Sequence, residues 1–150
     1  MFEIASLEPV VSGVTDCAGH DQRVNAEELV SIELADEERE VLRRGLNEWR
    51  GPAHCTEALA VAMGFRNVAD LHEEGNRLHA ALTAGDPLST RDWRRVLVAT
   101  EIVFASDVFG SGCDWSITTG YSDEDTIKIL RRLQRTIARE LRGALHRRDD

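Results

Sequence analysis

Two side chains of this sequence could perform acid–base or nucleophilic chemistry, Glu101 and Cys113. Glu101 interrupts an otherwise apolar stretch, residues 96–109, where a carboxylate must be paired or have a raised pKa, as a general acid or base would. No second carboxylate stands at a suitable spacing, so we expect Glu101 to be buried and to accept a structural hydrogen bond or salt bridge. Cys113 follows Gly110 and Gly112 in a bend that could expose a nucleophile. Because no histidine is near it in the sequence, we expect Cys113 to be a small buried apolar residue.

Cysteine and histidine could also hold a soft metal ion such as zinc. Cys17 and His20 stand three positions apart, and the adjacent His54 and Cys55 could supply a second pair. Adjacent side chains point in different directions from a helix or a strand, so His54 and Cys55 seldom reach one ion together. The phosphate-binding pattern Gly-x-x-x-x-Gly-Lys is absent from the sequence. We therefore expect no cofactor, no bound metal and no catalytic residue, which favours a protein that is not an enzyme.

Residues 56–82 have the organisation of a helix-turn-helix motif. A short apolar helix around Leu59 is followed by Gly64, which can supply the left-handed turn, and then by an amphipathic helix. This stretch resembles the DNA-binding helices of LexA-like and winged-helix repressors. The resemblance implies a DNA-binding transcriptional regulator, in which a dimer would combine the positive charges of Arg66, Arg77 and the last helix.

The charge of the second helix in this stretch argues against contact with DNA. Residues 67–79 carry Asp70, Glu73 and Glu74 against Arg77, a net charge of −2. A helix that reads bases needs cations for the phosphates, and these carboxylates would repel them. We expect the three acids to face solvent on a structural helical hairpin. Nucleic acid is therefore not the expected partner, and the DNA-binding regulator is the alternative.

Negative charge is concentrated in the first part of the chain. Of the 27 acidic residues 17 lie in residues 1–90, against seven of the 18 basic residues, and the formal net charge is −9. An acidic surface steers a cationic protein toward it and repels phosphate. We therefore predict a protein-binding module that acts through its acidic surface on a basic protein partner. The candidate partner-binding residues are Glu33, Asp36, Glu37, Glu40, Glu48, Asp70, Glu73 and Glu74.

Small size, acidity and the lack of catalytic motifs are typical of immunity proteins and antitoxins, a likeness of class and not of residues. A small enzyme that uses Glu101 or Cys113 is the third interpretation. Arginine supplies 17 of the 18 basic residues, which indicates a bacterium with a GC-rich genome. The identity of the partner and the oligomeric state stay open.

Cysteine usage and hydropathy favour a cytoplasmic location. The three cysteines are odd in number and widely spaced, so we expect no disulfide framework. The beginning of the sequence has no basic region followed by an apolar one, as a signal peptide would. Residues 96–109 are interrupted by Glu101 and Asp107, so we expect no membrane span.

The elements that must position these residues are mainly helical. With 150 residues, 42% of them apolar and 30% charged, the chain fits a single helical domain over residues 1–150. We predict about five helices packed around a buried central helix at roughly residues 90–109. Residues 1–29 are the least regular part, and a short N-terminal β-hairpin could join residues 7–14 to residues 30–34. The residues expected to cap the helices are Asp36, Thr56, Asn67, Ser89 and Ser122.

Overall fold

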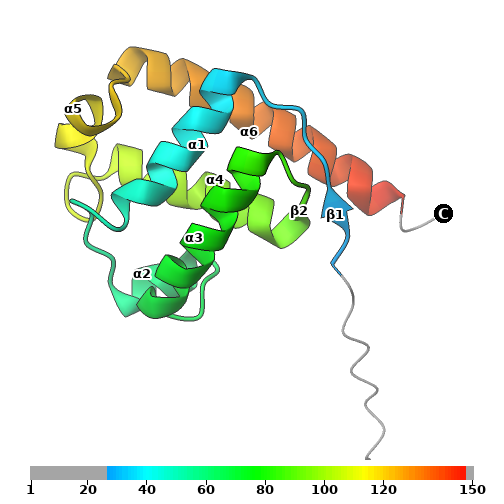
Figure 1. Cartoon of the computed structure of the whole chain (residues 1–150), viewed down its shortest axis with the longest axis horizontal. Helices are drawn as coiled ribbons and strands as arrows, with labels where there is room; N and C mark the ends of the chain where they lie inside the picture. The colour runs from blue at the N-terminus through cyan, green and yellow to red at the C-terminus, as the bar shows by residue number, and fades with distance from the viewer. Residues whose placement is uncertain (1–26, 148–150) are drawn as a thin grey trace, which may run out of the picture.

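The computed structural model describes residues 27–147, and this part of the chain is mainly helical, as the sequence predicts (Figure 1). Within residues 27–147 a two-stranded antiparallel sheet accompanies six α-helices. In chain order the elements are β1 (Leu29–Val30), α1 (Asp36–Glu48), α2 (Glu57–Ala62), α3 (Val68–Ala84), β2 (Leu88–Ser89), α4 (Thr90–Ala105), the 3-10 helix η1 (Gly112–Asp114), α5 (Trp115–Thr119) and α6 (Asp123–His146).

Side-chain caps begin four of the helices at the predicted residues. Thr56, Asn67, Ser89 and Ser122 each accept a hydrogen bond from the backbone N–H three residues later. These bonds satisfy N–H groups that have no partner inside the helix. The prediction for α1 is wrong by one residue, because Ala35 is the N-cap and Asp36 is already helical. There the Glu38 carboxylate closes the turn, since it accepts the Ala35 N–H at 2.9 Å.

Helix α4 is the central helix, and α1, α3 and α6 all contact it. Its buried face includes Val96, Ala99 and Val103. The helix ends at Ala105, four residues before the predicted end at residue 109. The Ser106 hydroxyl accepts hydrogen bonds from the N–H groups of Val108 and Phe109, which bends the backbone away from the helix.

The segment after this bend contains the short helix α5. Trp115 begins α5 and is fully buried, and its indole N–H donates to the Thr126 hydroxyl at 2.8 Å. The Trp115 ring also meets the Phe104 ring edge to face, with centroids 5.5 Å apart. Gly120 ends the helix with a φ of 80°, in the left-handed region. This anchoring turns the chain from α4 into α6.

The small sheet joins two segments that are far apart in the sequence. Strand β1 pairs antiparallel with β2, with Leu29 opposite Ser89 and Val30 opposite Leu88. Residues 7–14, the expected partner strand in the hairpin, lie outside the described residues. Residues 30–34 alternate as a half-buried strand would, because Val30, Ile32 and Leu34 are buried while the residues between them are exposed. The sheet therefore places the start of the described chain beside the beginning of α4.

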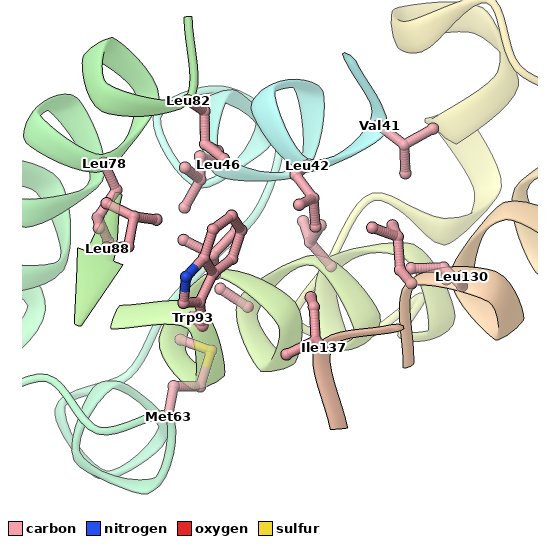
Figure 2. Close-up of a cluster of buried hydrophobic side chains, with 14 of the residues drawn as sticks. Val41, Leu42, Leu46, Met63, Leu78, Leu82, Leu88, Trp93, Leu130 and Ile137 are labelled. Carbon is pink, nitrogen blue, oxygen red and sulfur yellow. The ribbon is translucent and has the colours of Figure 1, made fainter. Parts of the chain in front are cut away.

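The buried apolar side chains form one cluster between α1, α3, α4 and α6. Figure 2 shows its middle, where Trp93 of α4 lies among leucines from α1, α3 and β2. The Trp93 indole N–H donates to the Val30 carbonyl at 2.8 Å, so the core also holds β1. Each of these helices contributes a stripe of apolar residues at the spacing of an amphipathic helix.

Candidate functional site

Four of the predicted partner-binding acids gather around the first half of α1. Glu33 and Asp36 are exposed, and neither forms an ion pair within residues 27–147. Glu37 is also exposed but pairs with Arg132 of α6. Glu40 is half-buried and holds two arginines of its own helix, Arg43 and Arg44, each at 2.7 Å. Negative charge here is therefore partly compensated from within the chain.

Asp86 joins this group, although the sequence analysis does not single it out. It follows Gly85, which ends α3 in the left-handed conformation. The Arg39 guanidinium of α1 donates to the Leu82 carbonyl at 3.0 Å, so the end of α3 lies against the start of α1. Asp86 is exposed and forms no ion pair among the described residues. We call Glu33, Asp36, Glu37 and Asp86 the acidic face.

The start of α6 also lies beside α1. Glu37, Asp125 and Arg132 line one shallow hollow together with Tyr121. Burial, with the negative charges of Glu40 and Glu37, raises the pKa of the Tyr121 hydroxyl. No local sequence pattern indicates this meeting of α1 with α6, because it depends on pairs such as Arg132 with Glu37.

Two of the eight acids predicted to bind a partner are buried, so the prediction that they belong to an acidic surface is wrong for these two. Asp70 is 4% exposed and does not face solvent. It accepts the Arg66 backbone N–H at 2.8 Å and a side-chain hydrogen bond from the Arg66 guanidinium, and these bonds lower the pKa of Asp70. Glu48 is 7% exposed at the end of α1, and its backbone carbonyl accepts the N–H groups of Gly51 and Ala53 in the following turn. Neither carboxylate is available to a partner.

Glu74 and Glu73 have different surroundings on α3. Glu74 pairs with Arg77 of its own helix at 2.7 Å and with the buried Arg95 of α4 at 3.5 Å. Asp92 of α4 binds the same two arginines, at 2.7 and 3.3 Å. Glu73 is exposed, so only one of the three acids expected to face solvent on this helix is fully open to it.

The helix-turn-helix segment has its cationic and amide groups engaged by the chain itself. Arg66 is held by Asp70, Arg77 by Glu74 and Asp92, and the Asn76 side chain by Arg50. The turn is also fixed, because the Arg95 guanidinium donates to the Gly64 carbonyl at 2.7 Å. The same guanidinium lies 4.9 Å from the centre of the Phe65 ring, a cation–π contact. This arrangement favours a structural role for the hairpin over reading DNA.

Glu101 is half-buried, so the expectation that it is largely buried is met only in part. Its pairing is as expected, because the Gln134 amide of α6 donates to its carboxylate at 2.7 Å. Glu101 and Gln134 both line a groove between α4 and α6. No carboxylate accompanies Glu101 in the lining of this groove.

Cys113 is exposed, and the expectation of a buried apolar residue is wrong. The nearby Asp107 carboxylate raises the pKa of the Cys113 thiol. Since the thiolate is the nucleophile, a raised pKa opposes a catalytic role at neutral pH. The bend that precedes Cys113 is held by a contact between distant segments. The His54 N–H donates to the Phe109 carbonyl, so the segment after α1 lies against the bend.

Within residues 27–147, no group of three or more His, Cys, Asp or Glu side chains could hold a metal ion. Cys17 and His20 lie outside this range, while His54 is exposed and Cys55 half-buried. Among the described helices, none combines the length and the hydropathy that crossing a bilayer requires. No family model, curated protein or solved structure matches the chain.

Proposed function

We propose that this chain is a non-enzymatic cytoplasmic protein-binding module whose acidic face engages a basic protein. The observation that carries the proposal is the exposure of Glu33, Asp36 and Asp86 at one end of the α1–α3 pair, where no cation of residues 27–147 forms an ion pair with them. Solvated carboxylates can exchange water for the guanidinium or ammonium groups of a partner. Their summed potential also steers a cationic protein toward this end.

The class of bacterial immunity proteins and antitoxins fits such a module best. A protein of this class has to find one basic partner quickly, and complementary charge raises the rate of encounter more than the final affinity. Glu37 and Glu40 add directional contacts, because the arginines that they hold within the chain can be exchanged for those of the partner. With Glu48 and Asp70 buried, we place the contact at the beginning of α1 and the end of α3, where the exposed acids gather, whereas the exposed Glu73 stands apart from them.

DNA binding is the weaker alternative on physical grounds. The cations of the helix-turn-helix segment are tied to carboxylates, and freeing Arg77 would cost the ion pair with Asp92 that joins the hairpin to α4. A nonspecific duplex is bound almost entirely through phosphate contacts, so it requires free cations. A mobility-shift assay with random duplex DNA at moderate salt should show no complex. Sub-micromolar binding in that assay would establish the regulator and remove the proposal.

The direct test uses the protein that copurifies with the full chain from its own cells, with the association rate followed by surface plasmon resonance. The rate should fall several-fold between ~0.1 M and ~1 M salt, because screening shortens the range of the attraction. Glu33→Lys should lower the rate further. Glu73→Lys is the matched control, since Glu73 is also exposed without an ion pair in the described part of the chain.

Glu73 is a suitable control because it lies away from the acidic face. Asn47 contacts His79 at 3.3 Å and Arg50 binds Asn76, so α3 runs antiparallel to α1 and Glu73 lies beyond the end of α1. The proposal predicts a slower rate for Glu33→Lys and little change for Glu73→Lys. Rates that do not respond to salt, or that respond equally to both substitutions, contradict it.

A further inference from the structure

A groove with an apolar floor runs between α4 and α6, apart from the acidic face. The two helices are antiparallel here, because Glu101 and Phe104 of α4 meet the start of α6, whereas Leu97 meets its later turns. The groove consists of two hollows, one of about 190 Å³ and one of about 280 Å³. Gln134 lines both hollows and marks their boundary.

Apolar side chains in this groove are open to solvent. Ile127 is 50% exposed and Leu145 is 46% exposed, although the spacing of α6 predicts both as inward-facing. They lie at opposite ends of the groove. Between them, Leu97, Phe104 and Ala138 are half-buried. Exposed apolar area of this kind, bordered by polar residues, is typical of a binding surface.

The border of the groove carries arginines that no acid of the described chain neutralises. Arg94, Arg131 and Arg142 line it, and none of them forms an ion pair within residues 27–147. Arg131 donates only to the Gln134 amide oxygen, at 2.9 Å. Arg135, exposed on the next turn of α6, also has no carboxylate partner in that range. We call Arg94, Arg131 and Arg142 the groove arginines.

These unpaired cations are unusual for this molecule. Apart from Arg135, every other arginine between residues 27 and 147 contacts a carboxylate, an amide oxygen or a backbone carbonyl of the chain, as Arg77 does with two carboxylates and Arg39 with the Leu82 carbonyl. The groove arginines therefore keep their donors available for an anionic ligand, in a protein whose net charge is −9. Bidentate pairing with a carboxylate is the contact that a guanidinium makes best.

We propose that this groove is a docking site for an acidic amphipathic helix of a partner protein. From residue 127 to residue 145 the groove wall spans roughly 27 Å, the length of a helix of about 18 residues. Apolar side chains at positions i, i+3, i+4 and i+7 of the incoming helix would fill the two hollows. Glutamates and aspartates beside this stripe would reach the groove arginines.

Charge argues against a second copy of this chain as the occupant. A symmetric contact through this groove would bring α6 of one copy against α6 of the other. The groove arginines of the two copies would then face each other, and like charges across an interface repel. A separate protein with an acidic helix meets the same surface with opposite charge.

The Glu101–Gln134 pair orients one of the groove arginines. The Gln134 amide N–H donates to Glu101, which leaves the amide oxygen to accept the hydrogen bond from Arg131. These two hydrogen bonds fix the direction of the Arg131 side chain at the boundary between the hollows. Glu101 therefore has a positioning role in docking, which its isolation among apolar residues did not suggest.

The test uses a synthetic helical peptide of about 18 residues, with leucines at i, i+3, i+4 and i+7 and glutamates at most other positions. Its binding to the full chain is measured by fluorescence anisotropy. Arg142→Glu and Ala138→Trp should each weaken binding about tenfold or more, because the first reverses a charge at the border and the second fills the larger hollow. Arg139→Glu makes the same charge change outside the groove and should stay within about twofold.

Circular dichroism of each variant shows whether it is folded, and Arg142→Glu keeps the test valid if Ala138→Trp does not fold. The proposal fails if the peptide does not bind, if a scrambled peptide of the same composition binds equally well, or if Arg139→Glu weakens binding as much as Arg142→Glu.

Other occupants of the groove would give different results. A dimer that Arg142→Glu dissociates in sedimentation would assign the groove to a second copy. Stronger displacement of the probe by a peptide of residues 1–26 than by the unlabelled probe would assign it to the chain's own segment. Either result would exclude a separate partner.

This inference does not depend on the acidic face. A chain that binds the acidic peptide but loses no association rate with Glu33→Lys would keep the groove and lose the proposed function. A chain that does not bind the acidic peptide but loses association rate with Glu33→Lys would keep the proposed function and contradict the docking groove.

Discussion

Replacing Gly45 with alanine should destabilise the fold, although alanine is the better helix former. Gly45 lies on the side of α1 that faces α4, and it is buried. A Cβ atom placed there would lie 2.5 Å from the Thr100 Oγ1 and 2.7 Å from its Cγ2. Thr100 cannot easily turn away, because it is fully buried and its hydroxyl donates to the Val96 carbonyl at 2.8 Å. The two helices would have to separate.

The magnitude follows from two opposing effects. Adding a methyl group to a well-packed core costs ~1–3 kcal/mol of unfolding free energy. Replacing glycine by alanine inside a helix returns up to ~1 kcal/mol. We therefore expect Gly45→Ala to lower the free energy of unfolding by ~1–2 kcal/mol. Gly75→Ala in α3 is the matched control, because nothing lies within 4 Å of a Cβ atom there, and it should stabilise by ~0.5–1 kcal/mol.

Urea denaturation followed by circular dichroism measures both changes, and the midpoints should shift in opposite directions. The double variant Gly45→Ala, Thr100→Ser should recover part of the loss, because serine lacks the colliding methyl group and its hydroxyl can change rotamer. If Gly45→Ala stabilises the chain as much as Gly75→Ala does, α1 and α4 do not approach each other this closely. The packing argument would then be wrong.

Two further predictions concern titrating groups. Because the pKa of Asp70 is lowered in the folded chain, its stabilising effect is present above the unfolded pKa of about 3.9 and is lost as the pH falls through the folded value. Asp70→Asn should therefore lower the free energy of unfolding by ~1–2 kcal/mol at pH 7 and by much less in acid. Denaturation at several pH values measures this difference, and an equal loss at all pH values would contradict the pairing with Arg66. Asp107→Asn should lower the pKa of Cys113 and speed its alkylation by iodoacetamide near pH 8, and an unchanged rate would show that the carboxylate does not hold the thiol.

Local signals predicted most of the helices. A capping side chain and the backbone N–H that it binds are three residues apart, so Thr56, Asn67, Ser89 and Ser122 could be identified from the sequence alone. The apolar spacing that follows each cap indicated which elements would pack. Helix ends were harder, because the hydroxyl of Ser106 stops α4 inside a stretch that is still apolar.

The exposure and the ion pairing of each acidic side chain were harder to predict. Arg66 precedes Asp70 by four residues, a spacing that could have suggested the ion pair, but the burial of Asp70 depends on tertiary packing. Glu74 and Asp92 share their arginines across two helices, and Arg132 reaches Glu37 from α6. Contacts between distant segments thus decide which acids remain on the surface. They also leave the groove arginines without acids among residues 27–147, which no pattern within α6 indicates.

The two limits of the described chain lie side by side. Glu28, just before β1, is 3.7 Å from the Arg147 guanidinium, which follows α6, and Figure 1 shows both ends at the same side of the molecule. In an unfolded chain of this length the same residues would be tens of Å apart on average. A pair of dyes at these positions would therefore report folding as a change in energy-transfer efficiency. Both labels would lie away from the start of α1, so the acidic face would stay open during the measurement.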